Sequence, residues 1–192
     1  MIKNKKYIKF IILAFILLNM RAFTEDNHHD HKDEQSQKAS KNESIKAHQH
    51  GVGILNIAQE NSKLIFEFEL PGFDIVGFEY KAKKKEDIKK VKQALKVLSD
   101  FSNMISLPTN ANCEISYSNA DLVIAGTHAE FFSKYILNCN NIIEINKIEI
   151  NYFKSFKNSK KLDVNLVTNN KKETFSNNKL ENTLNVKGYF IK

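Results

Sequence analysis

The sequence predicts an α+β protein, built mainly on an antiparallel sheet with one prominent amphipathic helix at about residues 84–105. Two observations lead to this class. Short runs with alternating apolar and polar residues occur on both sides of a single stretch with helical periodicity. Asn-rich or Gly-containing joints separate these runs, as expected for consecutive strands. A helix set apart from an antiparallel sheet defines the α+β class.

The first two strands have the clearest patterns, at residues 52–58 and 63–70, and the polar residues 59–62 join them as a hairpin. In the second strand the apolar side chains of one face are Leu64, Phe66, Phe68 and Leu70. The Pro-Gly pair at 71–72 predicts a turn. Residues 73–80 are apolar but irregular, which fits a short strand or a packed loop.

The helix is predicted from apolar residues that recur every three or four positions, with lysines on the opposite face. These residues are Ile88, Val91, Leu95, Leu98, Phe101 and Ile105. Pro108 ends the pattern. Further strands are expected at 112–118, 121–126, 130–139, 145–153, 160–168, 171–175 and 183–186.

Residues 1–22 have the three parts of a secretory signal peptide. Four lysines come first, residues 10–18 are continuously apolar, and Ala22 offers a small residue for cleavage. The apolar run is shorter than the roughly 20 residues of a membrane-spanning helix. We therefore expect a periplasmic or secreted protein, with membrane attachment only through an uncleaved leader.

The rest of the chain divides into two parts. Residues 23–47 are polar and lack apolar periodicity, which predicts a disordered tract rich in His, Asp and Glu. Residues 48–192 are expected to form a single α+β domain. The leader holds five of the 29 Lys and Arg and none of the 22 Asp and Glu, which leaves a formal charge of +2. With no Arg after Arg21, nothing indicates nucleic-acid binding.

The two cysteines, Cys113 and Cys139, predict one disulfide, because an even count in an exported chain favours pairing. The alternatives are a thiolate metal pair or a free catalytic thiol.

Five of the six histidines lie between residues 28 and 50. His28, His29 and His31 are interleaved with carboxylates, and imidazole is the commonest ligand for zinc and related metals. On a disordered chain such a cluster suits metal capture more than a rigid site. The alternative is a solvated polar linker that contains histidines.

His48 and His50 precede the first strand and share a face if the backbone is extended. Zinc wants about four ligands, so a further one must come from elsewhere. His128 is the candidate, since it is the only histidine of the folded region, near Asp121 or Glu130. The alternatives are a linker end for His48 and His50, and an ordinary loop histidine for His128.

The chain has no Gly-rich phosphate loop, no HExxH and no Gly-x-Ser-x-Gly. We therefore predict that it is not an enzyme. The remaining enzymatic alternative is an exported hydrolase that uses Cys139 and His128.

Several motifs stand in order along the chain: HQHG at 48–51, LNIA at 55–58, LIFEFE at 64–69 and IVGFE at 75–79. This order resembles the ZrgA family, zinc-regulated exported proteins of Gram-negative bacteria. The resemblance implies a periplasmic protein that binds Zn²⁺ and assists its uptake, beside a zinc ABC importer or the importer's binding protein. The resemblance also implies that His48, His50 and His128 bind the metal. The family tends to have His after the IVGFE run, where this chain has Tyr80. The alternative is a non-catalytic envelope structural or interaction protein with degenerate or no metal binding.

Overall fold

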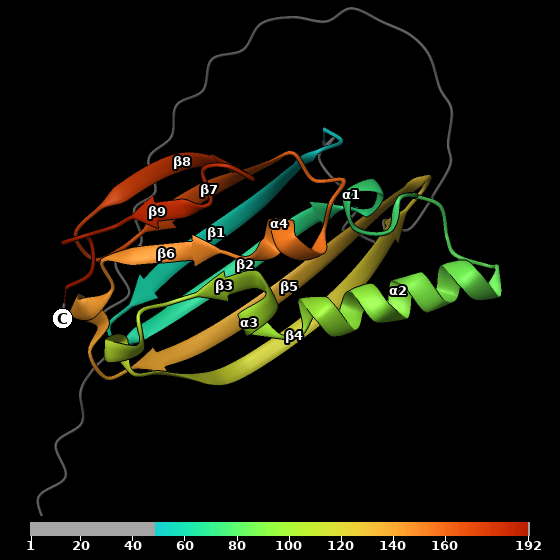
Figure 1. The fold of residues 1–192 in the computed structure, drawn as a ribbon. Helices are drawn as coiled ribbons and strands as arrows, with labels where there is room; N and C mark the ends of the chain where they lie inside the picture. Colours follow the sequence, from blue (N-terminus) through green and yellow to red (C-terminus); the bar gives the residue numbers. More distant parts are fainter. Residues whose placement is uncertain (1–48, 192) are drawn as a thin grey trace, which may run out of the picture. The chain divides into compact units, whose positions relative to one another are not determined.

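The structure, a computed structural model, describes residues 49–191 (Figure 1). The strands of this part are β1 (Val52–Glu60), β2 (Lys63–Pro71), β3 (Ile105–Ser106), β4 (Cys113–Ala125), β5 (His128–Cys139), β6 (Lys147–Ile150), β7 (Lys161–Val167), β8 (Lys172–Asn178) and β9 (Thr183–Asn185). The helices are α1 (Gly72–Val76), α2 (Lys85–Leu98), α3 (Phe101–Met104) and α4 (Tyr152–Ser155), with 3-10 turns η1 (Thr109–Ala111) and η2 (Ile142–Glu144). The fold is thus mostly β-sheet with few helices.

Six strands form one mixed sheet in the order β4-β5-β2-β1-β7-β8. The predicted hairpin is present, because β1 and β2 pair antiparallel across the two residues Asn61 and Ser62. Neighbouring strands of this sheet are antiparallel except β1 and β7, which are parallel with Val52 opposite Lys161. This parallel pair was not predicted from the sequence. It joins segments far apart in the chain, and local alternation carries no information on such pairing.

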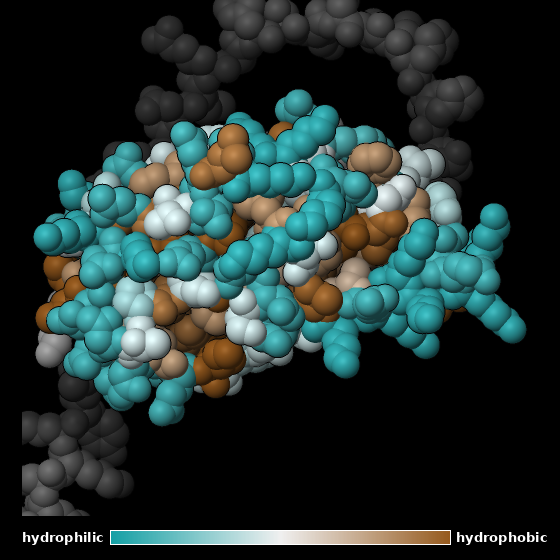
Figure 2. Space-filling view, in the orientation of Figure 1, coloured by the Kyte–Doolittle hydropathy of each residue, from teal (hydrophilic) through white to brown (hydrophobic). Residues whose placement is uncertain are grey.

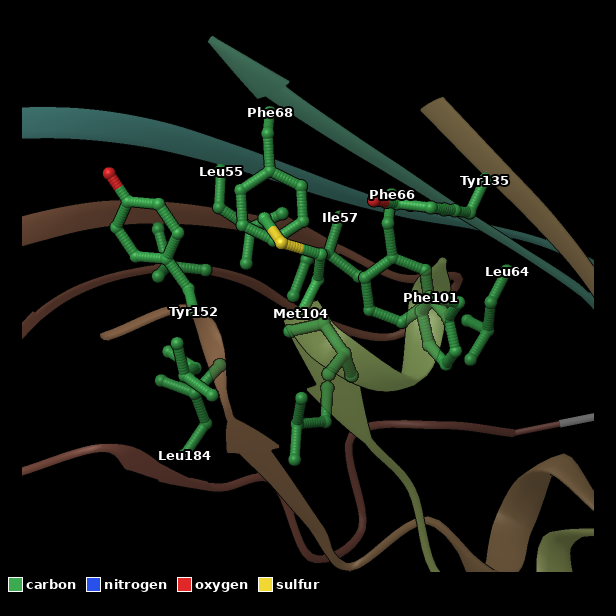
Figure 3. Close-up of a cluster of buried hydrophobic side chains, with 14 of the residues drawn as sticks. Leu55, Ile57, Leu64, Phe66, Phe68, Phe101, Met104, Tyr135, Tyr152 and Leu184 are labelled. Carbon is green, nitrogen blue, oxygen red and sulfur yellow. The ribbon is translucent and has the colours of Figure 1, made fainter. Parts of the chain in front are cut away.

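A second, three-stranded sheet has the order β3-β6-β9. Figure 1 shows that this sheet and helices α2, α3 and α4 lie on the same face of the large sheet. The core fills the space between these layers (Figure 3). Phe66 of β2 meets Phe101 of α3 edge to face at a centroid distance of 5.2 Å, and Phe101 meets Tyr135 of β5 at 5.3 Å. Burial raises the pKa of Tyr135 to about 12, so its hydroxyl stays protonated and donates to the Leu98 carbonyl.

The single helix expected at about residues 84–105 is interrupted. α2 ends at Leu98, and the N–H of Ser99 still donates to the Leu95 carbonyl. Asp100 then starts the separate helix α3, because its side chain accepts a hydrogen bond from the N–H of Ser102. The apolar spacing continues across this break, which is why the pattern read as one helix. The outer surface of α2 is hydrophilic, as its lysines require (Figure 2).

Several segments differ in detail from their predicted structure. The expected strands 112–118 and 121–126 form one strand, β4, with an irregularity between Ile115 and Tyr117. The expected strand 145–153 ends at Ile150 and gives way to helix α4. Residues 73–80, read as a strand or a packed loop, instead begin with the short helix α1.

Cys113 and Cys139 form a disulfide between β4 and β5, where they stand opposite each other in the strand register. The pairing predicted from the even cysteine count is therefore present. The bond ties the edge strand β4 to the interior of the sheet. Both cysteines of the chain are used in this way, so neither offers a thiolate to a metal.

Replacing both cysteines with alanine is expected to lower the free energy of unfolding by roughly 3 kcal/mol, because the bond closes a loop of 26 residues in the unfolded chain. Urea unfolding of the double variant measures this loss. An unaltered unfolding free energy would contradict the expectation.

The predicted signal peptide (1–22), the predicted disordered tract (23–47) and His48 lie outside the described residues, so these assignments stay predictions. Among the helices of residues 49–191, none has the length and apolar character needed to cross a bilayer.

Candidate metal site

Three segments of the chain meet at one end of the large sheet. β1 begins at Val52, β2 ends at Pro71 and β5 begins at His128. Antiparallel pairing of β2 with both neighbours brings these three strand ends together, and Pro71 stands opposite Glu130 in the register. α1 and the β4–β5 turn lie at the same end (Figure 1). Side chains from distant parts of the sequence therefore converge there.

His50 lies in a tight turn just before β1, closed by a 3.1 Å hydrogen bond from the Val52 N–H to the Gln49 carbonyl. The turn needs a glycine at Gly51, whose φ of 86° is unfavourable for residues with a side chain. The imidazole of His50 stacks on the ring of Phe73 in α1, with centroids 5.1 Å apart and planes 13° apart. The backbone of His50 is thereby held in place, and the Phe73 ring supports its imidazole on one side.

Glu79 lies in the loop that follows α1. This loop approaches β5 because Gly72 packs directly on Ala129, where an added Cβ would come within 2.8 Å of the Ala129 side chain. On the other side, the neighbouring Tyr80 bonds to Asp87 of α2. The loop is thus held between α2 and the start of β5. The Glu79 side chain is only 13% exposed.

The Glu79 carboxylate joins two histidines. His50 Nε2 lies 3.0 Å from Oε1, and His128 Nδ1 lies 3.2 Å from Oε2. His128 reaches this position as the first residue of β5, directly after the two-residue turn from β4. The structure therefore brings His50 and His128 together through a carboxylate. We call His50, Glu79 and His128 the His–Glu–His cluster.

The cluster has suitable ligand chemistry for zinc. Imidazole nitrogens and carboxylate oxygens bind zinc at about 2.0–2.2 Å, so two ligands of a tetrahedral ion lie roughly 3.3 Å apart. The two nitrogen–oxygen distances, 3.0 and 3.2 Å, are close to this spacing. Each nitrogen faces a different oxygen, however, and within residues 49–191 no three His, Cys, Asp or Glu side chains are arranged as they stand to hold a metal.

Closing the cluster around an ion needs rotation of side chains only. The imidazoles of His50 and His128 are 55% and 58% exposed, so they can turn without disturbing the core. A bound metal would take the place of the protons in the hydrogen bonds between the two imidazoles and the Glu79 carboxylate, because metal ligands usually release protons on binding. The residues present therefore offer ligand types that zinc takes, in an arrangement that would need these side chains to rotate.

Residues 47–186 match the model of a protein family described as ZrgA family zinc uptake protein. The match spans well over half of the 192 residues. The chain belongs to the ZrgA family. The resemblance predicted from the HQHG and IVGFE motifs is thus confirmed, and all three residues of the His–Glu–His cluster lie inside the matched region. A comparison with curated proteins found no match.

Tyr80 stands where the ZrgA resemblance led us to expect a histidine. Its ring stacks on Phe78 at a centroid distance of 4.6 Å, and its hydroxyl donates to Asp87 Oδ2 at 2.9 Å. This hydrogen bond is the main cause that raises the pKa of Tyr80. The phenol is therefore protonated and engaged with α2, so Tyr80 is a poor metal ligand in this arrangement.

Replacing Tyr80 with phenylalanine is expected to leave zinc affinity nearly unchanged, because the ring stack on Phe78 and the packing of Gly72 on Ala129 still hold the loop when the bond to Asp87 is lost. Zinc titration by calorimetry checks this. A loss of about 10-fold, typical of a residue that supports a metal ligand, would instead assign Tyr80 to the site.

The other predicted site residues fall into two groups. His28, His29, His31 and His48 lie outside the described residues. Asp121 does not join His128, because it bonds to Asn119 and stands opposite Phe132, well along β4. The structure does not support the hydrolase alternative. Cys139 is in a disulfide and lies at the opposite end of β5 from His128, so the two side chains cannot act together.

Sequence reasoning missed Glu79 as the residue that unites the two histidines. It lies at the end of the apolar IVGFE run, and neither spacing nor composition marks it. The one available signal was its place in the ZrgA motif, directly before the position where the family tends to carry a histidine. Nothing in the sequence indicated that Phe73, which is 42% exposed, supports His50 through a ring stack.

Proposed function

We propose that this protein captures zinc outside the cytoplasm and assists its uptake, and that the His–Glu–His cluster is the zinc site of the folded domain. The observation that carries the proposal is the Glu79 carboxylate, which contacts His50 at 3.0 Å and His128 at 3.2 Å. Membership in a zinc uptake family supports the choice of metal. The signal-like leader supports a periplasmic location.

The ligand chemistry also limits the metals that this site would take. The cluster offers imidazole and carboxylate, and both cysteines are in the disulfide. Hard ions such as calcium and magnesium prefer a larger set of oxygen ligands. Copper(II) would bind such a site more tightly than zinc in vitro, so affinity alone does not name the physiological metal.

We further propose that His48 completes the coordination and that His28, His29 and His31 collect zinc for the domain. His48 is two residues from His50 and is the histidine nearest to the cluster in the sequence. A zinc importer or its binding protein is the proposed recipient. Two half-exposed imidazoles suit such transfer, because a partner can reach the ion.

Calorimetric titration of the mature protein with zinc tests the proposal. We expect one tight site with submicromolar affinity, displaced by copper(II) and unaffected by an excess of calcium. The midpoint of thermal unfolding should also rise when zinc is added, because zinc that binds only the folded state stabilises that state. The absence of zinc binding would contradict the proposal and favour a non-catalytic interaction protein of the cell envelope.

A further inference from the structure

Asp74 is a buried acid next to the His–Glu–His cluster. It lies in α1 and is only 1% exposed. A buried carboxylate is costly unless it accepts hydrogen bonds. Asp74 Oδ1 accepts one from the N–H of Gly51 at 2.7 Å, and Gly51 directly follows His50. The acid thus holds the backbone on which a proposed zinc ligand is carried.

The second oxygen of Asp74 continues into a buried polar chain. Ser159 Oγ lies 3.4 Å from Asp74 Oδ2, and the Tyr152 hydroxyl contacts Ser159 Oγ. Burial raises the pKa of Tyr152, so its phenol keeps its proton. Because the carboxylate can only accept, the hydrogen bonds run from Tyr152 to Ser159 and from Ser159 to Asp74. The acid is therefore fixed by residues of α4 and the segment that follows it.

The same segment holds the His50 turn from the other side. The carbonyl of Gly51 accepts hydrogen bonds from the N–H groups of Lys160 and Lys161, at 2.9 and 2.8 Å. Asn158 Nδ2 donates to the carbonyl of Phe73 at 3.1 Å, and the Phe73 ring stacks on His50. Residues 158–161 therefore fasten both the backbone after His50 and the helix that carries its stacking partner.

We propose that Asp74 is a positioning residue for zinc binding, which sets the affinity of the cluster by fixing His50 relative to Glu79. The inference rests on the proposed function and deepens it. α1 carries Asp74 and Phe73, which hold His50, and leads directly into Glu79. Ligand and support thus lie on one continuous segment of the chain. Loss of such an outer support typically weakens metal binding about 10–100-fold.

The test uses Asp74→Asn and Asp74→Ala in the full mature chain, compared with the wild type. We expect zinc affinity to fall about 10-fold for the first and more for the second, because an amide oxygen can still accept from Gly51. Gln59→Ala is the matched control. Gln59 is a buried amide that donates to the carbonyls of Asn61 and Ile191 at the far end of β1 from His50, so its loss should lower stability and leave zinc affinity intact.

The visible spectrum of bound cobalt(II) provides a second measurement that lost stability alone would not move. Asp74→Asn should shift these bands and Gln59→Ala should not. If Asp74→Ala does not fold, Ser159→Ala, which removes one donor to the acid, should still weaken binding measurably. Wild-type affinity and spectrum in Asp74→Asn would overturn the inference and leave the zinc site standing. Failure of the wild type to bind zinc would instead overturn the proposed function.

Discussion

Replacing His128 with alanine is expected to weaken zinc binding at least about 100-fold. Structural zinc sites with four ligands contribute about 10–16 kcal/mol, so each ligand accounts for roughly 3 kcal/mol or about two orders of magnitude. His128 belongs to the cluster through its 3.2 Å contact with Glu79 and has no large role in the core, being 58% exposed. Calorimetry with zinc measures the loss, and thermal unfolding without metal should hardly change.

Glu79→Gln tests the same site with a change of charge and almost no change of shape. We expect a loss comparable to that of His128→Ala, because an amide lacks the negative charge that pairs with zinc. Glu67→Gln is the matched control. Glu67 pairs with Lys134 on the large sheet, away from the histidines, so its replacement should leave zinc affinity unaltered. Equal affinities for Glu79→Gln and Glu67→Gln would contradict the assignment of Glu79.

Phe66→Ala is expected to cost about 3–5 kcal/mol of unfolding free energy, the largest stability effect that we anticipate. Phe66 is fully buried in β2 and contacts Phe101 of α3 edge to face, so its loss opens a cavity between the large sheet and its covering layer (Figure 3). The midpoint of thermal unfolding should fall by roughly 10 °C or more. Urea unfolding gives the free energy directly.

Phe132→Ala is the matched control for this prediction. Phe132 lies on β5 with its side chain on the other face of the large sheet and is only partly buried, so a smaller loss is expected. The zinc affinity of Phe66→Ala, measured at a temperature where this variant is still folded, should equal that of the wild type. The reason is that the His–Glu–His cluster lies at one end of the large sheet, away from the core. Equal stability losses for the two variants would argue against the layered core.

The local patterns of the sequence predicted individual elements well. The alternation of Leu64, Phe66, Phe68 and Leu70 predicted strand β2, and the apolar spacing from Ile88 to Leu98 predicted helix α2. The pattern could not show the interruption at Asp100, because the apolar period continues beyond it while a side-chain cap starts a new helix. The parallel pairing of β1 with β7 was also out of reach, since it depends on contacts between distant segments.

The candidate site shows the same division between local and distant information. Imidazole chemistry singled out His50 and His128 as partners, and the structure joins them. The shared ligand Glu79 depends on Gly72 packing against Ala129, which turns the loop after α1 toward β5. No residue spacing in the sequence indicates that this loop lies against β5. The support from Asp74 depends equally on a serine 85 residues away.

The most direct test of the central claim is the position of zinc in a crystal of the zinc-loaded protein, located by anomalous diffraction at the zinc edge. We expect a peak at about 2.0–2.2 Å from a nitrogen of His50, a nitrogen of His128 and an oxygen of Glu79. A well-ordered protein with no zinc between these three side chains, or with zinc held only at other positions, would contradict the account.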